Sequence, residues 1–428
     1  MKPHPFFKKA HLAFVGAALP LAIPASLLAQ SVIAPPPGVF STTAVEEAHS
    51  KNPPEKRLSN MASALGAGGP LIQRGPFALR PHILYRLLYS DGLLNVGQTE
   101  SGNSVIQTVS VGTALELGKR WVFDYTLTKN YSSNRFIADS TDHAFSLGGG
   151  ISYGDLQFGV SQTYNSNAPT LVETGTQTNQ QSYATTAHAS LPLGSRTVTA
   201  VSITRSTRLA NAPARTPEWT TSDWRSLKAT GSIAYFISPR LQASFVYTAG
   251  RDYVSRGSDM IHSQPQGQVS WRPTNKLSLS ANAGVEQRRF LAGSTATLNT
   301  PLYAVSGHYQ PTQTTGFSVS TRRSLSASYF ANQATQGTSV SFGYEQRILG
   351  KYFWTTDFSQ FETKYIATIA GTATGRVDKG SIVGTRIATV LLGRASLSVF
   401  YQVGHNTSSR IGFGFSSHQV GSEIGYRF

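Results

Sequence analysis

The stretch "LSLSANAGVEQRRF" (277–290) alternates between apolar and polar side chains along most of its length. Successive side chains of an extended chain point to opposite faces, so this segment has one apolar face and one polar face. Residues 316–329 and 395–404 repeat the pattern, which predicts that Leu325 and Ala327 belong to the apolar face. Such strands are typical of a β-barrel wall with hydrocarbon outside and water inside.

Short turns and longer polar loops alternate from residue 77 onward. The short turns are rich in Gly, Pro, Asn and Asp and lie at 117–120, 153–155, 192–195, 237–240, 273–276, 311–314, 349–351 and 392–394. Longer loops such as 165–180, 209–222 and 365–380 lie between them. Eight short turns and about nine long loops predict an all-β, up-and-down, antiparallel transmembrane barrel of about 18 strands (16–18). A β-sandwich or a propeller does not sort its connections by length in this way.

The composition agrees with a membrane barrel and excludes other classes of protein. The 428 residues include no cysteine, which excludes a disulfide scaffold and a thiolate metal site. Only 14% of the residues are charged, which is few for a soluble surface. Outside the first 30 residues no apolar run is long enough for a transmembrane helix.

The first 30 residues have the features of a secretory signal peptide. Lys2, Lys8 and Lys9 precede an apolar stretch that ends in small residues. The alternative is an uncleaved anchor helix, but Pro20 and Pro24 interrupt the apolar stretch and disfavour it. Cleavage would remove three lysines and no acids from the formal charge of +16, which leaves +13.

The chain therefore divides into a signal peptide (1–30), an N-terminal segment (31–75) and a barrel (76–428). The segment 31–75 contains many Pro and Gly residues without a sustained period, and we expect it to be flexible and periplasmic. An even number of strands predicts that both ends of the barrel face the periplasm of a Gram-negative bacterium.

Aromatic residues near the short turns form a second pattern. Their amphipathic rings favour the headgroup level of a bilayer, which predicts a periplasmic girdle. The girdle and assembly candidates are Trp121, Tyr153, Trp271, Tyr352, Trp354, Tyr426 and Phe428. The alternative is a sugar-stacking track, which would need rings that point inward. The last strand, "GSEIGYRF" (421–428), resembles the signal that the barrel-assembly machinery recognises.

Several basic residues fall on the predicted inner face of the wall. These pore-lining candidates are Arg80, Arg86, Lys228, Arg288, Arg322, Arg347 and Arg386, against five acids at Asp124, Asp142, Glu286, Glu345 and Glu423. A lumen richer in arginine would attract anions. The alternative is that arginine–carboxylate pairs only brace the wall. Basic loops would also contact outer-membrane lipid and anionic lipopolysaccharide, whereas nucleic acid is no expected partner of an exported barrel.

The sequence carries no recognisable catalytic or metal-binding motif. Asp142 and His143 are adjacent, but neighbours on a strand point to opposite faces and cannot act as an orienter and a base. The glycines at 148–150 are not a phosphate loop, because no helix follows them. We therefore expect no enzymatic activity, no cofactor and no metal.

Three stretches resemble a known family of outer-membrane barrels. Residues 87–97, 117–136 and 139–178 are similar to segments of the β-barrel porin 2 family, and the resemblance is dense only over 85–185. Some members of that family are linked by context to exopolysaccharide export. The family has no catalytic motif, so the resemblance implies no site residues.

These observations predict a porin-like channel for passive passage of small polar or anionic solutes. Polysaccharide export, with the polymer as a further partner, is one alternative, and a non-transport surface scaffold or adhesin is another. No long inward loop is obvious, although the loops at 205–222 or 365–380 could fold into the lumen as a constriction.

Overall fold

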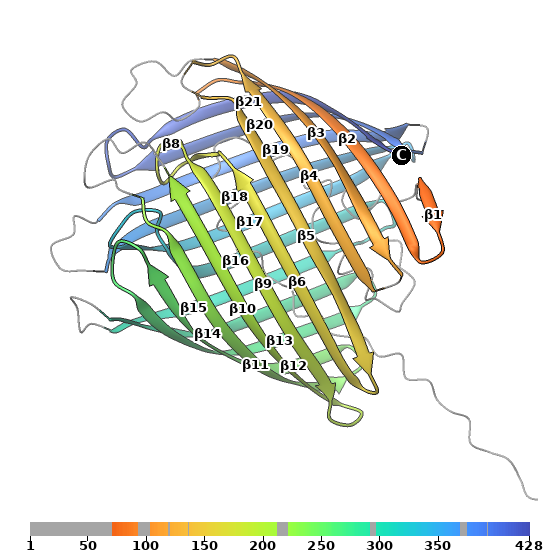
Figure 1. Ribbon diagram of the computed structural model, residues 1–428, viewed down its shortest axis with the longest axis vertical. Coiled ribbons are helices and arrows are strands. Elements are labelled where there is room, and N and C mark those ends of the chain that lie inside the picture. The colour runs from red at the N-terminus through yellow and green to blue at the C-terminus, as the bar shows by residue number, and fades with distance from the viewer. Residues whose placement is uncertain are drawn as a thin grey trace, which may run out of the picture.

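The computed structural model describes residues 71–92, 103–118, 120–135, 137–211, 221–291, 297–368, 375–391 and 393–428. Eighteen strands of 12–16 residues form one antiparallel sheet, in which the first long strand (β2) pairs with the last (β21) and closes the ring (Figure 1). Among these residues, no helix is long and apolar enough to cross a membrane.

The long strands follow one another around the ring in chain order. They are β2 (Phe77–Ser90), β3 (Ser104–Leu117), β4 (Trp121–Ser132), β5 (Ser140–Tyr153), β6 (Leu156–Asn167), β9 (Asn179–Pro192), β10 (Thr197–Asn211), β11 (Trp224–Ser238), β12 (Leu241–Val254), β13 (Met260–Thr274), β14 (Leu277–Phe290), β15 (Thr297–Tyr309), β16 (Thr315–Ala327), β17 (Gln333–Ile348), β18 (Tyr352–Ala367), β19 (Val377–Leu391), β20 (Ala395–Ser408) and β21 (Phe415–Arg427). The all-β, up-and-down barrel predicted from the sequence is confirmed. All eight short turns lie where the turn-forming sequences predict them.

The two faces of the sheet differ in the way that the alternation predicts. On β14, Leu279 and Val285 are exposed on the outside, whereas Glu286 and Arg288 are buried on the inside. On β11, Leu227, Ile233 and Ile237 are each about half exposed and point outward. An apolar outer surface around a closed ring of paired strands satisfies what the interior of a bilayer requires.

Both ends of the described chain lie at the short-turn end of the ring. A short strand, β1 (Ile72–Arg74), turns at Gly75 and pairs with the start of β2, close to the C-terminus (Figure 1). Paired strand structure thus begins at Ile72, slightly before residue 76. The predicted signal peptide and nearly all of the predicted flexible segment lie outside the described residues.

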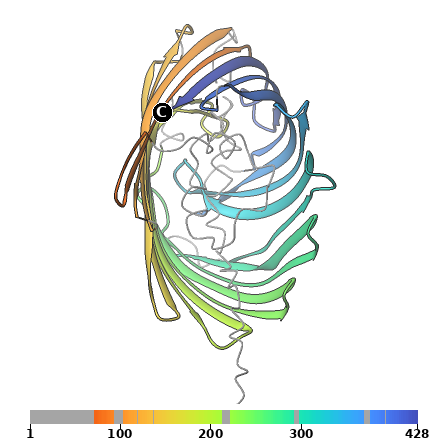
Figure 2. The ribbon, with the colours of Figure 1, turned by 90° about the vertical axis from the view of Figure 1, so that its right-hand side faces the viewer.

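The hairpin of β16 and β17 leaves the wall at the long-loop end. The pairing between β15 and β16 stops at Tyr303 and Arg323, although β16 continues to Ala327. Ala327 packs with Met260 and Phe290, which belong to the inner faces of β13 and β14. The tip of the hairpin therefore reaches into the ring, as Figure 2 shows.

This departure corrects one prediction about the apolar face. The alternation places Leu325 and Ala327 toward lipid, but both side chains are only 8% exposed. The alternation itself is intact along β16. What changes is the surface that the last residues of β16 contact. The hairpin lies inside the ring there, so these side chains meet the inner wall and not lipid.

The Trp121 ring lies over Gly149 on the outer face, where the two residues pair across β4 and β5. A methyl group at Gly149 would overlap the indole ring, so we expect Gly149→Ala to destabilise the barrel by about 1–3 kcal/mol. Urea unfolding in lipid vesicles, followed by tryptophan fluorescence, measures this. Gly231→Ala is the matched control, because a methyl group there meets no atom within 4 Å. Equal stability of the two variants would contradict the role of the ring.

Candidate functional site

The inner wall of the ring carries a continuous row of serines. Register pairs Ser270 with Ser280, Ser280 with Ser306, Ser306 with Ser320, Ser320 with Ser341, and Ser341 with Ser359. Six consecutive strands, β13 to β18, thus contribute one hydroxyl each at the same level. Because neighbouring strands are about 4.8 Å apart, the row extends over roughly 24 Å of the wall.

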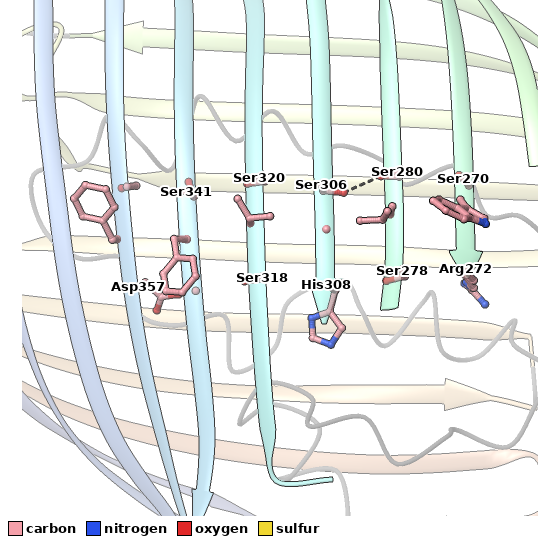
Figure 3. A pocket seen from close by; sticks show the side chains of 18 of the residues that line it. Ser270, Arg272, Ser278, Ser280, Ser306, His308, Ser318, Ser320, Ser341 and Asp357 are labelled. Carbon is pink, nitrogen blue, oxygen red and sulfur yellow. Dashed lines mark hydrogen bonds between the residues drawn. The ribbon is translucent and has the colours of Figure 1, made fainter. Parts of the chain in front are cut away.

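A cavity of about 850 Å³ lies against this row (Figure 3). Besides the serines, Arg272, His308 and Asp357 border it, and Ser280 and Ser306 are joined by a hydrogen bond of 2.7 Å. Serine side chains are short and can donate and accept hydrogen bonds, so this part of the wall is both wide and easily wetted. The serines can bond polar solutes there, while residues such as Trp271, Leu279 and Val319 add apolar surface to the same cavity.

All seven basic residues that the sequence places on the inner face have the inward parity of their strands. Structure adds inward-facing charges that the sequence reading missed. The cationic side chains on the inner face of the described strands are Arg80, Arg86, Arg208, Lys228, Arg272, Arg288, Arg322, Arg347, Arg386 and Arg427. The acidic ones are Glu116, Asp124, Asp142, Asp252, Glu286, Glu345, Asp357, Asp378 and Glu423. Ten cations against nine acids leave a surplus of one positive charge.

Arg288 belongs to a buried network and not to an open surface. Its guanidinium lies 2.5 Å from the Glu286 carboxylate and 3.6 Å from that of Asp252, and both carboxylates are almost fully buried. His262 lies 3.6 Å from Asp252, and Gln264 donates a hydrogen bond of 2.8 Å to Glu286. For this arginine the structure supports the bracing alternative.

A second network braces the seam where the barrel closes. Arg86 of β2 pairs in register with Glu423 of β21, and Arg386 lies 3.4 Å from the same carboxylate. The two guanidinium groups lie 4.8 and 5.1 Å from the centre of the Phe400 ring. Arg80 is likewise paired, with Glu116 at 3.3 Å. These contacts hold neighbouring strands together across the inner face.

The remaining predicted cations are more open. Within the described part of the chain, neither Lys228 nor Arg322 forms an ion pair, although Lys228 lies 5.9 Å from the Trp224 ring. Arg347 is exposed at the short-turn end and donates a hydrogen bond to the Gly350 carbonyl. These three side chains are the stronger candidates for contact with a solute.

The 165–180 loop, which the sequence analysis names as a long loop but not as a constriction, enters the lumen. Residues 168–178, between β6 and β9, contain a small hairpin, β7 (Thr170–Leu171) with β8 (Thr176–Gln177), and are largely buried. Val172 packs with Leu88, Ile106 and Phe400, which lie on the inner faces of β2, β3 and β20. The loop therefore reaches inner strands well away from its own place in the ring.

Glu173 at the tip of this loop is its main attachment point. The carboxylate accepts hydrogen bonds from the Ser328 hydroxyl and from the Tyr329 N–H, the latter at 2.6 Å, at the tip of the β16–β17 hairpin. Arg208 donates to the Ala327 and Ser328 carbonyls and lies 3.9 Å from the centre of the Tyr329 ring. Two inward segments are thus fastened to each other and to β10.

Arg376 fastens the same loop from the opposite side. Its guanidinium donates to the Glu173 and Val172 carbonyls at 2.8 and 2.9 Å and pairs with Asp378 at 2.5 Å. It also lies 3.6 Å from the centre of the Phe413 ring. Arg376 belongs to the 365–380 loop, which the sequence analysis named as a possible constriction, and here it anchors another loop.

The sequence contained an unused signal for these inward segments. Leu88, Ile106, Met260, Phe290 and Phe400 are apolar residues at positions whose parity points into the ring. Apolar side chains on the inner face are stabilised by burial, and Val172 of the 168–178 loop and Ala327 of the β16–β17 hairpin pack against them. Apolar residues of inward parity near the loop ends therefore predict a folded-in loop.

The predicted girdle residues all have outward parity near the short turns. Tyr153 is 82% exposed, and Trp271, Tyr352, Tyr426 and Phe428 are also exposed. Trp121 and Trp354 are partly buried. The Trp121 ring lies over Gly149, and the Trp354 indole N–H donates a hydrogen bond of 2.9 Å to the Thr385 hydroxyl.

The adjacent Asp142 and His143 separate to the two faces of β5. Asp142 accepts a hydrogen bond from Asn130 on the inside, whereas His143 bonds to the Tyr125 hydroxyl on the outside. In the residues that the structure describes, no cluster of three or more His, Asp or Glu side chains could hold a metal ion.

Comparison with known proteins gives no family assignment. No family model and no curated protein matches the chain, so the resemblance to the β-barrel porin 2 family remains an expectation. Solved structures with a similar outline include OccK11 (OpdR) of Pseudomonas aeruginosa, with 11% identity, a TM-score of 0.43 and coverage of 82% of this chain and 96% of that one.

Two further structures resemble the barrel to the same degree. OccAB4 of Acinetobacter baumannii has 8% identity, and OccK2 (OpdF) of Pseudomonas aeruginosa, solved in complex with glucuronate, has 11% identity. Both give a TM-score of 0.45 and cover 82% of this chain and 98% of their own. A likeness this low carries no functional argument, so function is argued below from the wall and lumen of this chain.

Attachment of the inward loop should depend on pH through Glu173. Burial raises the pKa of this carboxyl, against the opposing effects of the Ser328 hydroxyl, Arg208, the Tyr329 N–H and Arg376. A raised pKa means that the inserted loop favours the protonated form. Its stabilisation is therefore complete below the ordinary pKa of glutamate and is lost as pH rises through the raised value.

Amide hydrogen exchange of residues 170–178 measures this dependence. We expect stronger protection at about pH 4 than at about pH 8, after correction for intrinsic exchange rates. Glu173→Gln keeps the acceptor oxygen and removes the titration, so its protection should not change over this range. The same pH dependence in both proteins would contradict the assignment to Glu173.

Proposed function

We propose that this chain forms a water-filled channel across the bacterial outer membrane for passive passage of small polar solutes. The observation that carries the proposal is the contrast between the two faces of one closed sheet. Outward residues such as Val201 and Ile233 are exposed and apolar, while the inner wall carries the serine row and ten cationic side chains. Barrels of 16–18 strands leave an aqueous lumen unless it is filled.

The two inward segments favour passage of small solutes over passage of polymers. The Glu173 loop and the tip at Tyr329 meet inside the ring, and Arg376 and Arg208 hold them there. A polysaccharide chain would require these buried contacts to open. A small solute requires only space beside them, and the serine-lined cavity lies in the wall from β13 to β20, clear of both segments.

Selectivity should favour anions only mildly. Five of the inner cations, namely Arg80, Arg86, Arg208, Arg288 and Arg386, lie against acids, aromatic rings or carbonyls that hold them in the wall. Lys228, Arg322 and Arg347 are more open, but Glu345 on β17 and Asp357 on β18 add negative charge to the same inner face. We therefore infer a channel for polar solutes with a small preference for negative charge.

The short-turn end faces the periplasm in this proposal. The exposed aromatic residues at that end fit a headgroup-level girdle, and the terminal strand with Tyr426 and Phe428 fits a substrate of the assembly machinery. The long-loop end, with the inward segments, then faces the outside of the cell.

Purified protein in a planar lipid bilayer should conduct ions, and release of the inward loop should raise the conductance. Replacement of residues 170–177 by a short Gly-Ser link removes β7, β8 and Glu173, and we expect a several-fold larger single-channel conductance because the lumen widens. Reversal potentials in a salt gradient should show a mild anion preference.

Ile411→Ser is the control, since Ile411 is 99% exposed and outside the lumen; its conductance should equal that of the parent protein. Folded protein that never conducts would refute the channel, and would favour a surface scaffold or adhesin.

The absence of cysteine allows the orientation to be tested by labelling. Ile411→Cys places a thiol at the long-loop end, and Asp155→Cys places one in a short turn. We expect a membrane-impermeant maleimide to label the first variant in intact cells and the second only after the outer membrane is permeabilised. The reverse result would invert the proposed orientation.

A further inference from the structure

A row of arginines crosses the outer face of the barrel near the long-loop end. Register pairs Arg205 of β10 with Leu227, Leu227 with Arg251 of β12, Arg251 with Ile261, and Ile261 with Arg289 of β14. Basic and apolar residues therefore alternate across five consecutive strands. A fourth basic residue, Arg225, lies two positions from Leu227 on β11.

The four arginines point away from the lumen. Their positions share the parity of Ile203, Leu227, Tyr253 and Ile261, all of which are exposed on the outer face. Neighbouring strands are about 4.8 Å apart, so arginines two strands apart lie roughly 10 Å from each other along the row. We call Arg205, Arg225, Arg251 and Arg289 the arginine row.

The row lies at the boundary of the apolar band that is nearer to the long-loop end. Arg289 is the residue before the last of β14, and Arg225 is the second of β11. Toward the other end of the same strands, outward positions carry exposed apolar residues such as Val201, Ile233 and Phe245. Cations at this depth would lie where hydrocarbon gives way to headgroups.

The charge of the row is only partly compensated. Arg251 pairs with Asp259 at 3.1 Å, whereas within the described part of the chain Arg205, Arg225 and Arg289 form no ion pair. Elsewhere on the same rim the outward Lys364 and Lys379 share the Glu362 carboxylate, at 3.1 and 3.5 Å. Unlike that trio, the arginine row leaves cationic groups available to an external anion.

We propose that the arginine row binds the phosphate groups of the outer-leaflet glycolipid, lipopolysaccharide. Guanidinium groups match phosphate oxygens with paired hydrogen bonds, and the apolar residues between and below them suit the acyl chains of the same molecule. A free phosphate would use only the first feature. The proposal rests on the outward orientation of the long-loop end, and not on conductance.

The test measures binding of purified, detergent-solubilised protein to deep-rough lipopolysaccharide by native mass spectrometry. The triple variant Arg205→Gln, Arg225→Gln and Arg289→Gln removes the three cations without an internal ion pair. We expect its apparent affinity to fall by about tenfold or more, because each cation near an anionic lipid surface contributes separately. Monophosphoryl lipid A should bind the parent protein more weakly than the bisphosphorylated form, and inorganic phosphate should not compete at millimolar concentration.

A matched control removes the same number of charges from the opposite end. Arg120→Gln, Arg196→Gln and Arg240→Gln change exposed residues in or beside short turns, and binding should stay at the parent level. Heat-modifiable migration in gels checks that both variants are folded.

Equal affinity of the triple variant and the parent would overturn the proposal, and so would an equal loss in the control. Conductance of the triple variant in neutral lipid should remain that of the parent protein. A loss of lipid binding with unchanged conductance thus separates this inference from the proposed channel.

Discussion

Closure of the sheet is the constraint on which the rest of this structure depends. In hydrocarbon an unpaired backbone N–H or C=O has no water to bind, so a strand can face lipid only if both of its edges are paired. The pairing of β2 with β21 removes the last open edge. Arg86 and Glu423 stand opposite each other at that seam, with Arg386 and the Phe400 ring beside them.

Once the ring is closed, its two faces meet different solvents and carry different chemistry. Outside, the apolar band ends in aromatic residues at one rim and in the arginine row at the other. Inside, many of the charged side chains are paired within the wall, as Arg288 is with Glu286 of its own strand and with Asp252 of β12. The serine row carries no charge and forms a polar surface available to a solute along six strands.

Two inward segments partly fill the lumen of the barrel. The loop at Glu173 and the hairpin tip at Tyr329 cover apolar inner residues and are joined through Arg376 and Arg208. Their contacts come from strands far apart in the chain. Their position follows from burial of a few apolar side chains and from the polar contacts of Glu173, Arg376 and Arg208.

The amino-acid sequence by itself determined the strand number, the turns and the face of nearly every side chain, because a period of two and the turn residues are local properties. It could not decide what those faces meet. Leu325 keeps its predicted parity but is buried. Arg288 points inward as predicted, but it is buried in ion pairs with Glu286 and Asp252. Only the tertiary structure decided which loop fills the lumen and which arginines align across strands, since both depend on register between segments distant in the chain.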